Sequence, residues 1–431
     1  MAYVVALLAT RWGSDLGGLN VFNKGLAEGL IQALPKGSQT LCFVNRLPTT
    51  TISEGEVQLI EHEEFSTTIL ASEIASHCAT LDIGTLQGVL VVGHDAITGQ
   101  AAVDCANQLR EHLGDETSVK SAVIGHMDYS AYAFMKGHSL EEVTERSIKQ
   151  RDIIAAADCA FAVGPLLQSN FASARSAMHR PRSPVRPLTP GVNEVKWNHH
   201  NPRVDLQVFI SGRLNSEDDP IKNSILAIHA LAEAYKRGRQ ISAAAWDARG
   251  QLFAWGVDPS SDRAAIDELK AIGSKSAAFV LHAEPFSDDQ KVLRQSLAGC
   301  HVALMPSWHE GFGLSGWEAL CAGVPLVCSR QSGLAMLIDD LKQQFPEVSF
   351  DSVVFVNIGG SLTAGTPSAE DIGTCADALL EITSNLEVRK QAAIQLASLL
   401  KREFSWKRCA SDLLEGTGWD LPGSVHWSNR Q

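Results

Sequence analysis

The stretch HVALMPSWHEGFGLSGWEALCAGVPLVCSR, residues His301 to Arg330, decides the fold of this chain. It opens with the apolar run Val302 to Met305 and closes with a second apolar run, Val324 to Cys328. Each run has the length and continuity of a strand that is buried on both faces of a parallel sheet. Between the runs, the pattern predicts a loop that ends at Gly313 and a short helix from Leu314 to Ala322. This order of elements predicts an α/β fold with parallel sheets.

Glycines and carboxylates surround the predicted start of the helix. Gly311 and Gly313 allow the backbone to come close to a ligand, and the unpaired N–H groups of a first helical turn attract an anion. Glu310 lies in the loop, and Glu318 lies one turn into the helix with its side chain directed back toward the same loop. Two carboxylates beside an anion site need hydrogen-bond donors, which sugar hydroxyls supply. Spacing alone fits a plain glycine turn with two surface glutamates equally well.

The full string is more specific than its spacing. It reads His309-Glu310-Gly311-Phe312-Gly313-Leu314, then Glu318-Ala319-Leu320, then Gly323-Val324-Pro325-Leu326-Val327. This string closely resembles the signature of the retaining glycosyltransferases of the GT-B fold, and is most similar to family 4, the sucrose-synthase and sucrose-phosphate-synthase relatives. The resemblance implies two doubly wound, Rossmann-like domains that face a cleft, with a C-terminal helix that crosses back to the first domain.

The resemblance also implies roles for the residues of this stretch. Glu310 is expected to bind hydroxyls of the transferred sugar, and Glu318 is expected to bind the ribose hydroxyls. The residues expected to line the donor site around them are Gly311, Phe312, Gly313 and Leu314. The donor is expected to be a nucleoside-diphosphate sugar, with UDP as the favoured nucleotide, and the transfer is expected to retain the anomeric configuration of a hexose.

Two basic residues are expected to bind the donor diphosphate. The apolar run Val204 to Ile210 predicts a strand, Arg213 follows it, and Lys222 comes at the start of the next predicted helix. Guanidinium and ammonium groups suit a pyrophosphate, and the resembled family uses such a pair in this way. The loop Asn215 to Ile221 is several residues longer than is usual in the family, which weakens the assignment of Lys222 more than that of Arg213. The chain has no Asp-x-Asp pair, so neither a metal nor another cofactor is expected.

The segment after the next predicted strand departs from the family. That strand is predicted from Ile241 to Ala245, and the family usually follows it with a glycine-rich turn that admits the nucleotide. This chain has Trp246-Asp247-Ala248-Arg249-Gly250 instead. The resemblance therefore implies an altered base or ribose pocket.

The first half of the chain carries polar residues at predicted strand ends. Gly17-Gly18 opens a predicted helix; a glycine pair by itself indicates a turn, but in the resembled family a pair here faces the diphosphate and the acceptor. The spacing is not G-x-G-x-x-G, which gives little support to a dinucleotide-dependent oxidoreductase.

His94-Asp95 and His126 follow two further predicted strands, at the strand ends where ligands of open parallel sheets bind. A histidine at a strand end is more often a structural residue, but two at neighbouring ends favour a site. The resemblance implies that one of the two contacts the transferred sugar, with His94 slightly preferred, and Lys136 matches a basic residue of the family.

Composition bounds the class of protein. At 431 residues the chain exceeds one ordinary core, and 45% hydrophobic with 20% charged residues is typical of a globular protein. A formal charge of -13 argues against nucleic-acid binding. The nine cysteines form no CxxC pair, which favours free thiols in a reducing compartment. The first apolar run, Tyr3 to Ala9, is too short for a signal peptide or a membrane span. We therefore expect a cytoplasmic protein without a membrane span.

The resemblance also divides the chain. Pro190-Gly191-Val192-Asn193 resembles the segment that closes the first domain, and His199-His200-Asn201-Pro202 predicts a linker. The ending Phe404-Ser405-Trp406 resembles the point where the final helix crosses back. We therefore assign residues 1–193 and the helix 405–431 to an acceptor-side domain, and residues 194–404 to a donor-binding domain.

Three functions fit these patterns. The first is a glycosyltransferase with an unidentified acceptor, which the resemblance favours. The second is a nucleotide-sugar hydrolase or phosphorylase, in which water or phosphate replaces the acceptor. The third is a nucleotide-sugar sensor with little turnover, which the altered segment from Trp246 to Gly250 permits. Consumption of the donor separates the third from the others, and a new glycosidic product separates the first from the second.

Overall fold

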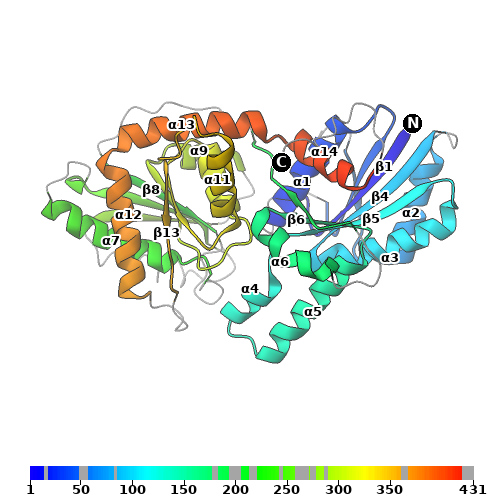
Figure 1. The fold of residues 1–431 in the computed structure, drawn as a ribbon, viewed down its shortest axis with the longest axis horizontal. Helices are drawn as coiled ribbons and strands as arrows, with labels where there is room; N and C mark the ends of the chain where they lie inside the picture. The colour runs from blue at the N-terminus through cyan, green and yellow to red at the C-terminus, as the bar shows by residue number, and fades with distance from the viewer. Residues whose placement is uncertain are drawn as a thin grey trace. The chain divides into compact units, whose positions relative to one another are not determined.

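The computed structural model describes residues 1–13, 18–47, 57–81, 85–176, 183–193, 205–212, 221–241, 246–257, 271, 278–285, 290–360 and 367–419. The chain divides into two compact units. The first unit comprises Met1–Ser130, Glu141–Gly191 and Phe404–Gln431, and the second comprises Ala131–Leu140 and Val192–Glu403. Each unit is built on a parallel sheet with surrounding helices, as predicted (Figure 1).

The first unit has a seven-stranded sheet in the order β3-β2-β1-β4-β5-β6-β7 over its described residues. Its strands are β1 (Ala2–Ala9), β2 (Gln39–Val44), β3 (Val57–Glu61), β4 (Leu86–His94), β5 (Ser118–Gly125), β6 (Cys159–Val163) and β7 (Arg186–Leu188). Because the strand order reverses between β1 and β4, the carboxyl ends of these strands flank the point at which doubly wound sheets bind ligands.

Helices cover both faces of this sheet. They are α1 (Gly18–Ala33), α2 (Thr67–Ala79), α3 (Asp95–Leu113), α5 (Leu140–Ala156), α6 (Pro165–Ser176) and α14 (Trp406–Gly416). The short helix α4 (Tyr129–Met135) begins in this unit and continues into the second unit. Alternate residues of β1, namely Val4, Ala6 and Leu8, pack with buried residues of α2 and α3. Successive strand residues point to opposite faces, so the remaining residues of β1, which are also buried, serve the other face.

The last helix of the described chain returns to the first unit, as the resemblance implied. Helix α14 packs on α1, and the Trp406 ring meets the Phe22 ring edge-on at 5.4 Å. Two glycines of α1 permit this approach. A Cβ at Gly25 would lie 2.2 Å from the Trp406 ring, and one at Gly29 would lie 2.1 Å from the Trp406 carbonyl oxygen. No side chain other than hydrogen fits at either position without displacing α14.

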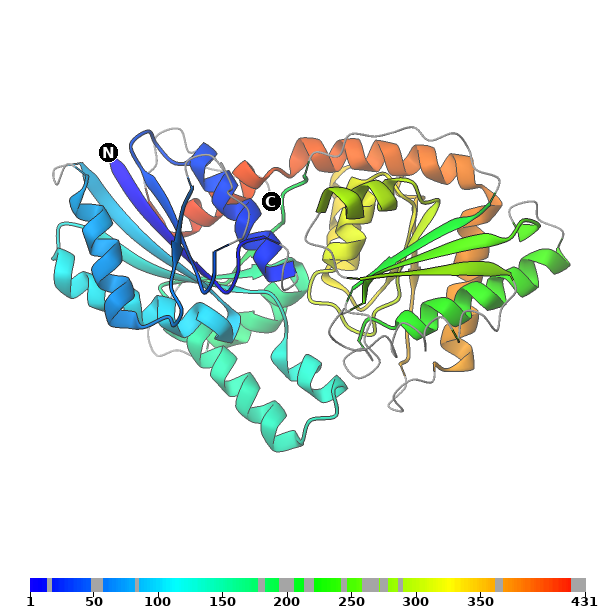
Figure 2. The same ribbon diagram turned by 180° about the vertical axis from the view of Figure 1, so that it is seen from behind.

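The second unit has a six-stranded sheet in the order β10-β9-β8-β11-β12-β13 over its described residues (Figure 2). Its strands are β8 (Gln207–Ser211), β9 (Gly250–Val257), β10 (Phe279–Pro285), β11 (Val302–Met305), β12 (Leu326–Ser329) and β13 (Val353–Val356). Its helices are α7 (Ser224–Gln240), α9 (Gln290–Ala298), α10 (Leu314–Cys321), α11 (Gly333–Gln344), α12 (Ala369–Ser384) and α13 (Leu386–Glu403). The strand order reverses between β8 and β11, which places a second ligand-binding edge at their carboxyl ends.

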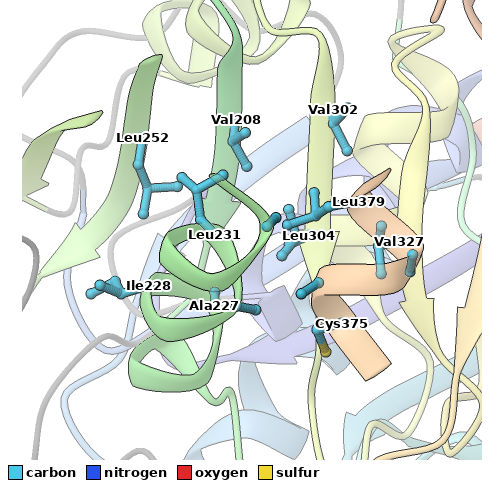
Figure 3. Packing of buried hydrophobic residues seen from close by; sticks show 14 of the residues in the cluster. Val208, Ala227, Ile228, Leu231, Leu252, Val302, Leu304, Val327, Cys375 and Leu379 are labelled. Carbon is cyan, nitrogen blue, oxygen red and sulfur yellow. The ribbon is translucent and has the colours of Figure 1, made fainter. Parts of the chain in front are cut away.

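The core of the second unit lies between this sheet and the pair α7 and α12. Strand residues such as Val208, Leu252 and Leu304 point toward Leu231 of α7 and Leu379 of α12 (Figure 3). The near-continuous apolar character of these strands reflects burial on both faces. All nine cysteines are free and buried, in agreement with the sequence prediction. Among the described residues, no helix has the length and apolar character needed to cross a membrane.

One predicted element is wrong. The strand expected from Ile241 to Ala245 does not begin there, because Ile241 terminates α7; residues 242–245 lie outside the described part of the chain. The strand is β9, which begins at Gly250, so Trp246 precedes it instead of following it. The Trp246 ring is fully buried and packs edge-on against Tyr235 at 4.7 Å. Trp246 is a core residue, and the argument for an altered nucleotide pocket no longer holds.

Candidate functional site

In the second unit, the main chain fixes the position of Glu310. The Glu310 N–H donates to the carbonyl oxygen of Gln331 at 3.0 Å, and the Glu310 carbonyl accepts from the Gly333 N–H at 3.1 Å. Glu310 also forms a parallel β-bridge with Ser332, the residue that caps α11. The backbone of Glu310 is therefore held independently of its side chain.

Lys222 reaches Glu310 because the residues on either side of it are anchored to the end of β11. The Ile221 carbonyl accepts from the Trp308 N–H at 2.8 Å, and the Asn223 side-chain amide donates to the Pro306 carbonyl at 2.9 Å. The ammonium of Lys222 forms a hydrogen-bonded ion pair with the Glu310 carboxylate. Their side chains are 28% and 17% exposed, so the pair is accessible to a ligand. The longer preceding loop therefore leaves Lys222 within reach of Glu310.

Two glycines at the ends of neighbouring strands lie beneath Lys222. A Cβ at Gly212 would contact the aliphatic part of the Lys222 side chain at 3.3 Å, and a Cβ at Gly256 would lie 1.9 Å from the Gly212 carbonyl oxygen. Gly256 was missed in the sequence because its strand was misplaced. Arg213, the residue after Gly212, lies outside the described residues, so its predicted contact with a diphosphate stays a prediction.

The start of α10 has the backbone geometry that was predicted. Gly313 is the N-cap residue with φ 105° and ψ 57°, a left-handed conformation, and it supplies no side-chain cap. A Cβ at Gly313 would lie 2.9 Å from Met305 Sδ, so only glycine fits. The N–H groups of Leu314, Ser315 and Gly316 therefore have no acceptor within the helix and lie at its positive end, whereas the Trp317 N–H donates to the Gly313 carbonyl at 2.9 Å. Phe312 is 3% exposed and packs on Trp317 at 5.7 Å, so its side chain belongs to the core and, like Gly311, it offers a ligand only backbone.

Glu318 lies on α10 and is partly buried. Burial raises the pKa of its carboxyl from 4.5 to about 7, and the positive charge of Arg294 opposes this rise. Near neutral pH a fraction of this carboxyl is protonated, and such a group both donates to and accepts from hydroxyls. This chemistry suits a pair of ribose hydroxyls. Among the described residues, no cluster of three or more His, Cys, Asp or Glu side chains has a metal-binding arrangement.

In the first unit, the two predicted histidines are in direct contact. His94 Nδ1 lies 2.9 Å from His126 Nε2, and His94 Nε2 lies 2.8 Å from the Asn23 Oδ1 atom. His94 is fully buried with both ring nitrogens engaged, whereas His126 is partly exposed. Burial therefore favours His126 over His94 as the ring that a ligand can reach, and the sugar contact itself stays a prediction. Sequence spacing did not reveal this difference, because both residues simply follow a strand.

Asp95 connects the same strand ends. It has a left-handed backbone, with φ 47°, which is rare for a residue other than glycine. Its Oδ1 atom accepts from the His126 N–H at 3.0 Å and from the Gln150 side-chain amide at 3.1 Å, while its Oδ2 atom is buried without a hydrogen-bond partner. Burial raises the Asp95 pKa from 3.8 to about 7, and these hydrogen bonds oppose the rise. A strained residue with an unsatisfied carboxyl oxygen is typical of a functional site.

Sequence reasoning missed Gln150. Its side-chain amide donates to the Met127 carbonyl at 2.7 Å as well as to Asp95, and its Oε1 atom accepts from the Tyr129 N–H at 3.2 Å. Gln150 is 2% exposed, so these bonds fix the loop that carries His126. The only sequence signal is a polar residue at a helix position that faces the sheet.

The remaining predicted residues are less informative. Gly18 is the exposed first residue of α1, and Gly17 lies outside the described residues. Lys136 places its ammonium 4.8 Å from the centre of the Tyr132 ring. Both of these residues belong to the short segment Ala131–Leu140 that is grouped with the second unit.

The buried histidine predicts a pH effect on stability. Burial lowers the His94 pKa from 6.5 to about 3, so the unfolded chain takes up a proton at His94 between these values while the folded protein does not. Stability is lost as pH falls below 6.5. Between pH 7 and pH 5, wild type should lose about 2 kcal/mol more unfolding free energy than a His94→Gln variant. Urea unfolding at both pH values measures this difference; equal losses would show that His94 is not held neutral.

Comparison with known proteins gives a match over almost the whole chain. A family model described as Family 4 Glycosyltransferase in conflict systems matches residues 6–413. A curated relative is the GDP-mannose-dependent alpha-(1-6)-phosphatidylinositol dimannoside mannosyltransferase of Mycobacterium tuberculosis, strain ATCC 25177 / H37Ra, which is 30% identical over 174 residues. This stretch covers 40% of the chain and 39% of the relative's length, so the two align over about two fifths of each.

Solved structures share the fold. Sucrose-phosphate synthase from Thermosynechococcus elongatus is 18% identical with a TM-score of 0.61, and the match covers 96% of this chain and 97% of that one. The trehalose-6-phosphate protein from E. coli, bound with UDP-2-fluoro glucose, is 12% identical with a TM-score of 0.62, and the match covers 97% and 100%. At these identities the likeness shows the fold alone, and it confirms the predicted architecture of two Rossmann-like domains.

Proposed function

The chain belongs to the GT-B proteins described as family 4 glycosyltransferases in conflict systems, and from this premise we propose that it is a retaining hexosyltransferase. In this proposal the enzyme moves a hexose from a nucleoside-diphosphate sugar to an unidentified acceptor, and it does so without a metal ion. The nine buried free thiols support a reducing, cytoplasmic location for this reaction.

The observation that carries the proposal is the Lys222–Glu310 ion pair beside the start of α10. An ammonium group, a row of helical N–H donors and a carboxylate at one sheet edge match the two halves of a nucleotide sugar. The diphosphate would bind Lys222 and the N–H groups, and the sugar hydroxyls would donate to Glu310. Donor binding would thus exchange the internal ion pair for two contacts with the ligand.

This arrangement supports a mechanism without a metal. When the bond between the sugar anomeric carbon and the phosphate oxygen breaks, negative charge develops on the leaving diphosphate. Lys222 and the N–H groups of α10 would stabilise that charge, together with Arg213. The acceptor oxygen would attack from the leaving-group face, its proton would pass to the departing phosphate, and the configuration would be retained. Glu310 would hold hydroxyls and would not attack the sugar.

The similar proteins support a donor that carries a hexose, and their names mention two different nucleotides. The name of the mycobacterial relative specifies GDP-mannose, and the E. coli structure holds UDP-2-fluoro glucose. In both cases the sugar is a hexose on a nucleoside diphosphate. We therefore widen the UDP preference of the sequence to UDP and GDP. The sensor alternative loses its basis, because Trp246 is a core residue.

The first unit would supply a hydroxyl-binding group of its own. His126 is partly exposed at the carboxyl end of β5, and the buried Asp95 accepts from its backbone N–H at 3.0 Å. A sugar hydroxyl that approached this edge of the sheet would find an imidazole nitrogen.

Donor binding tests the proposal without knowledge of the acceptor. UDP-glucose or GDP-mannose should raise the melting temperature in excess EDTA, by an amount that corresponds to about 2.7 kcal/mol at a hundred times the dissociation constant. The matched control is free glucose or mannose, which lacks the diphosphate and should have no effect. The proposal is contradicted if neither nucleotide sugar binds, or if binding appears only after magnesium is added.

A further inference from the structure

A chain of hydrogen bonds leads from the core of the first unit to His126. It begins at the Cys42 sulfur on β2, which accepts from the Asn23 side-chain amide at 3.3 Å. Asn23 Oδ1 then faces His94 Nε2 at 2.8 Å, and His94 Nδ1 faces His126 Nε2 at 2.9 Å. Asn23, Cys42 and His94 are all fully buried, so water does not compete for these bonds.

The chemistry of each atom determines which partner donates in each of these hydrogen bonds. An amide oxygen can only accept a hydrogen bond, so the proton between Asn23 and His94 must reside on His94 Nε2. A neutral imidazole carries one proton, which leaves His94 Nδ1 as an acceptor. The proton between the two rings must therefore reside on His126 Nε2, and His126 Nδ1 is left with a bare lone pair.

We infer that Asn23 and His94 are positioning residues that hold His126 in the tautomer with the proton on Nε2, so that its Nδ1 atom accepts a hydrogen bond from a ligand hydroxyl. No hydrogen-bond partner is recorded for His126 Nδ1 among the residues that the structure describes. The opposite tautomer would place a donor there and would require a different group on the ligand.

The surroundings keep this arrangement neutral and fixed. Burial lowers the pKa of His94 to about 3, and burial together with the neighbouring His94 lowers that of His126 well below 6.5. Burial raises the pKa of the Cys42 thiol to about 12, so Cys42, the first residue in this series of hydrogen bonds, remains uncharged. The Phe22 ring packs edge-on against His126 at 5.0 Å, and Asp95 accepts from the His126 backbone N–H.

The identity of the ligand rests on the proposed function, whereas the tautomer does not. If the enzyme transfers a hexose, the hydroxyl that His126 accepts from is a sugar hydroxyl of one of its substrates. A hydrogen bond of this kind favours a substrate that presents a hydroxyl hydrogen at this point. A deoxy-sugar substrate that lacks this hydroxyl would lose the contact.

Nitrogen NMR of the free protein reads the tautomers directly. In protein labelled with ¹⁵N-histidine, a protonated ring nitrogen and a bare one have well-separated shifts, and His94→Gln and His126→Gln variants assign the two rings among fourteen. We expect Nε2–H and bare Nδ1 for both rings in wild type at pH 7. A proton on His126 Nδ1 would overturn the inference, whatever the activity of the protein.

Substitutions at Asn23 test the cause. Asn23→Leu removes the acceptor and should release His94 and His126 into mixed tautomers, whereas Asn23→Asp keeps an oxygen acceptor and should preserve them. The matched control is Asn20→Leu. Asn20 is buried on the same helix, but it accepts from Thr10 and the Arg11 N–H and does not contact either histidine. Unchanged tautomers in Asn23→Leu would overturn the assignment of Asn23.

Enzyme activity then tests whether the tautomer that Asn23 sets matters for ligand binding. Loss of one correctly directed hydrogen bond should lower kcat/KM by about tenfold in Asn23→Leu, and Asn23→Asp should recover most of that loss. Equal activity of Asn23→Leu and wild type, with tautomers altered, would overturn the role in ligand binding. If wild type shows the expected tautomers but consumes no nucleotide sugar, the proposed function fails while the tautomer assignment stands.

Discussion

Replacing Lys222 with methionine should lower the rate of sugar transfer by about a hundredfold or more, because the leaving diphosphate would lose a stabilising positive charge. Methionine keeps most of the aliphatic side chain that occupies the space beside Gly212, so local packing should be preserved. Donor-consumption kinetics with UDP-glucose and GDP-mannose measure the effect. We expect kcat of the Lys222→Met variant to fall, because negative charge develops on the diphosphate in the transition state.

The control for this substitution is Lys236→Met on α7. Lys236 is an exposed lysine whose side chain pairs with Glu233 one turn away, so its loss removes the same charge without touching the sheet edge. Its transfer rate should match wild type. Equal rates for Lys222→Met and wild type would remove Lys222 from the reaction and leave the ion pair with Glu310 as a purely structural contact.

Replacing Glu310 with glutamine should reduce transfer by a similar factor, about a hundredfold. In the proposed mechanism the carboxylate accepts from the sugar hydroxyls, and an amide accepts less strongly and adds two donors. The protein should stay folded, because hydrogen bonds of the main chain hold residue 310. Circular dichroism and the melting temperature check the fold, and donor consumption checks the activity.

The control for Glu310 is Glu387→Gln on α13. Glu387 is exposed and pairs with Lys390 on the same helix, so the change should leave both stability and turnover at the wild-type level. Near-normal turnover of Glu310→Gln would show that sugar hydroxyls bind elsewhere. A large fall in melting temperature, with turnover lost, would mean that the ion pair serves the fold.

Local pattern predicted the elements around these residues well. The strand, loop, helix and strand between His301 and Arg330 follow from two apolar runs and from glycines at fixed places, and the structure confirms them as β11, α10 and β12. Gly313 has the left-handed backbone that only glycine adopts without strain. Such features depend on neighbours in sequence, so a single sequence contains them.

Contacts between distant residues could not be predicted in the same way. Lys222 and Glu310 are 88 positions apart, and only the resemblance suggested that they share a site. Asn23 and His94 are 71 positions apart, and nothing in the pattern of α1 distinguishes Asn23 from an ordinary polar helix residue. The two histidines looked alike because burial depends on the assembled sheet. The result is that one is enclosed and the other is partly exposed.

The misplaced strand has a similar cause. Ile241 to Ala245 has the short apolar run of a buried strand, but apolar runs of this length also occur at helix ends. The sequence places Gly250 in a turn, but it is the first residue of β9, and a Cβ there would lie 1.8 Å from the Tyr235 hydroxyl oxygen. Tertiary packing, which the sequence does not display, decided between the two positions.

The anomeric configuration of the first product tests the central claim most directly. The wild-type protein, treated with excess EDTA, should release or transfer a hexose from UDP-α-glucose or GDP-α-mannose. Proton NMR of the first-formed product, recorded before mutarotation, should show the α-anomer, because Lys222 and the α10 N–H groups hold the leaving group on the face that the acceptor attacks. A β-anomer, or activity that EDTA abolishes and magnesium restores, would contradict the account.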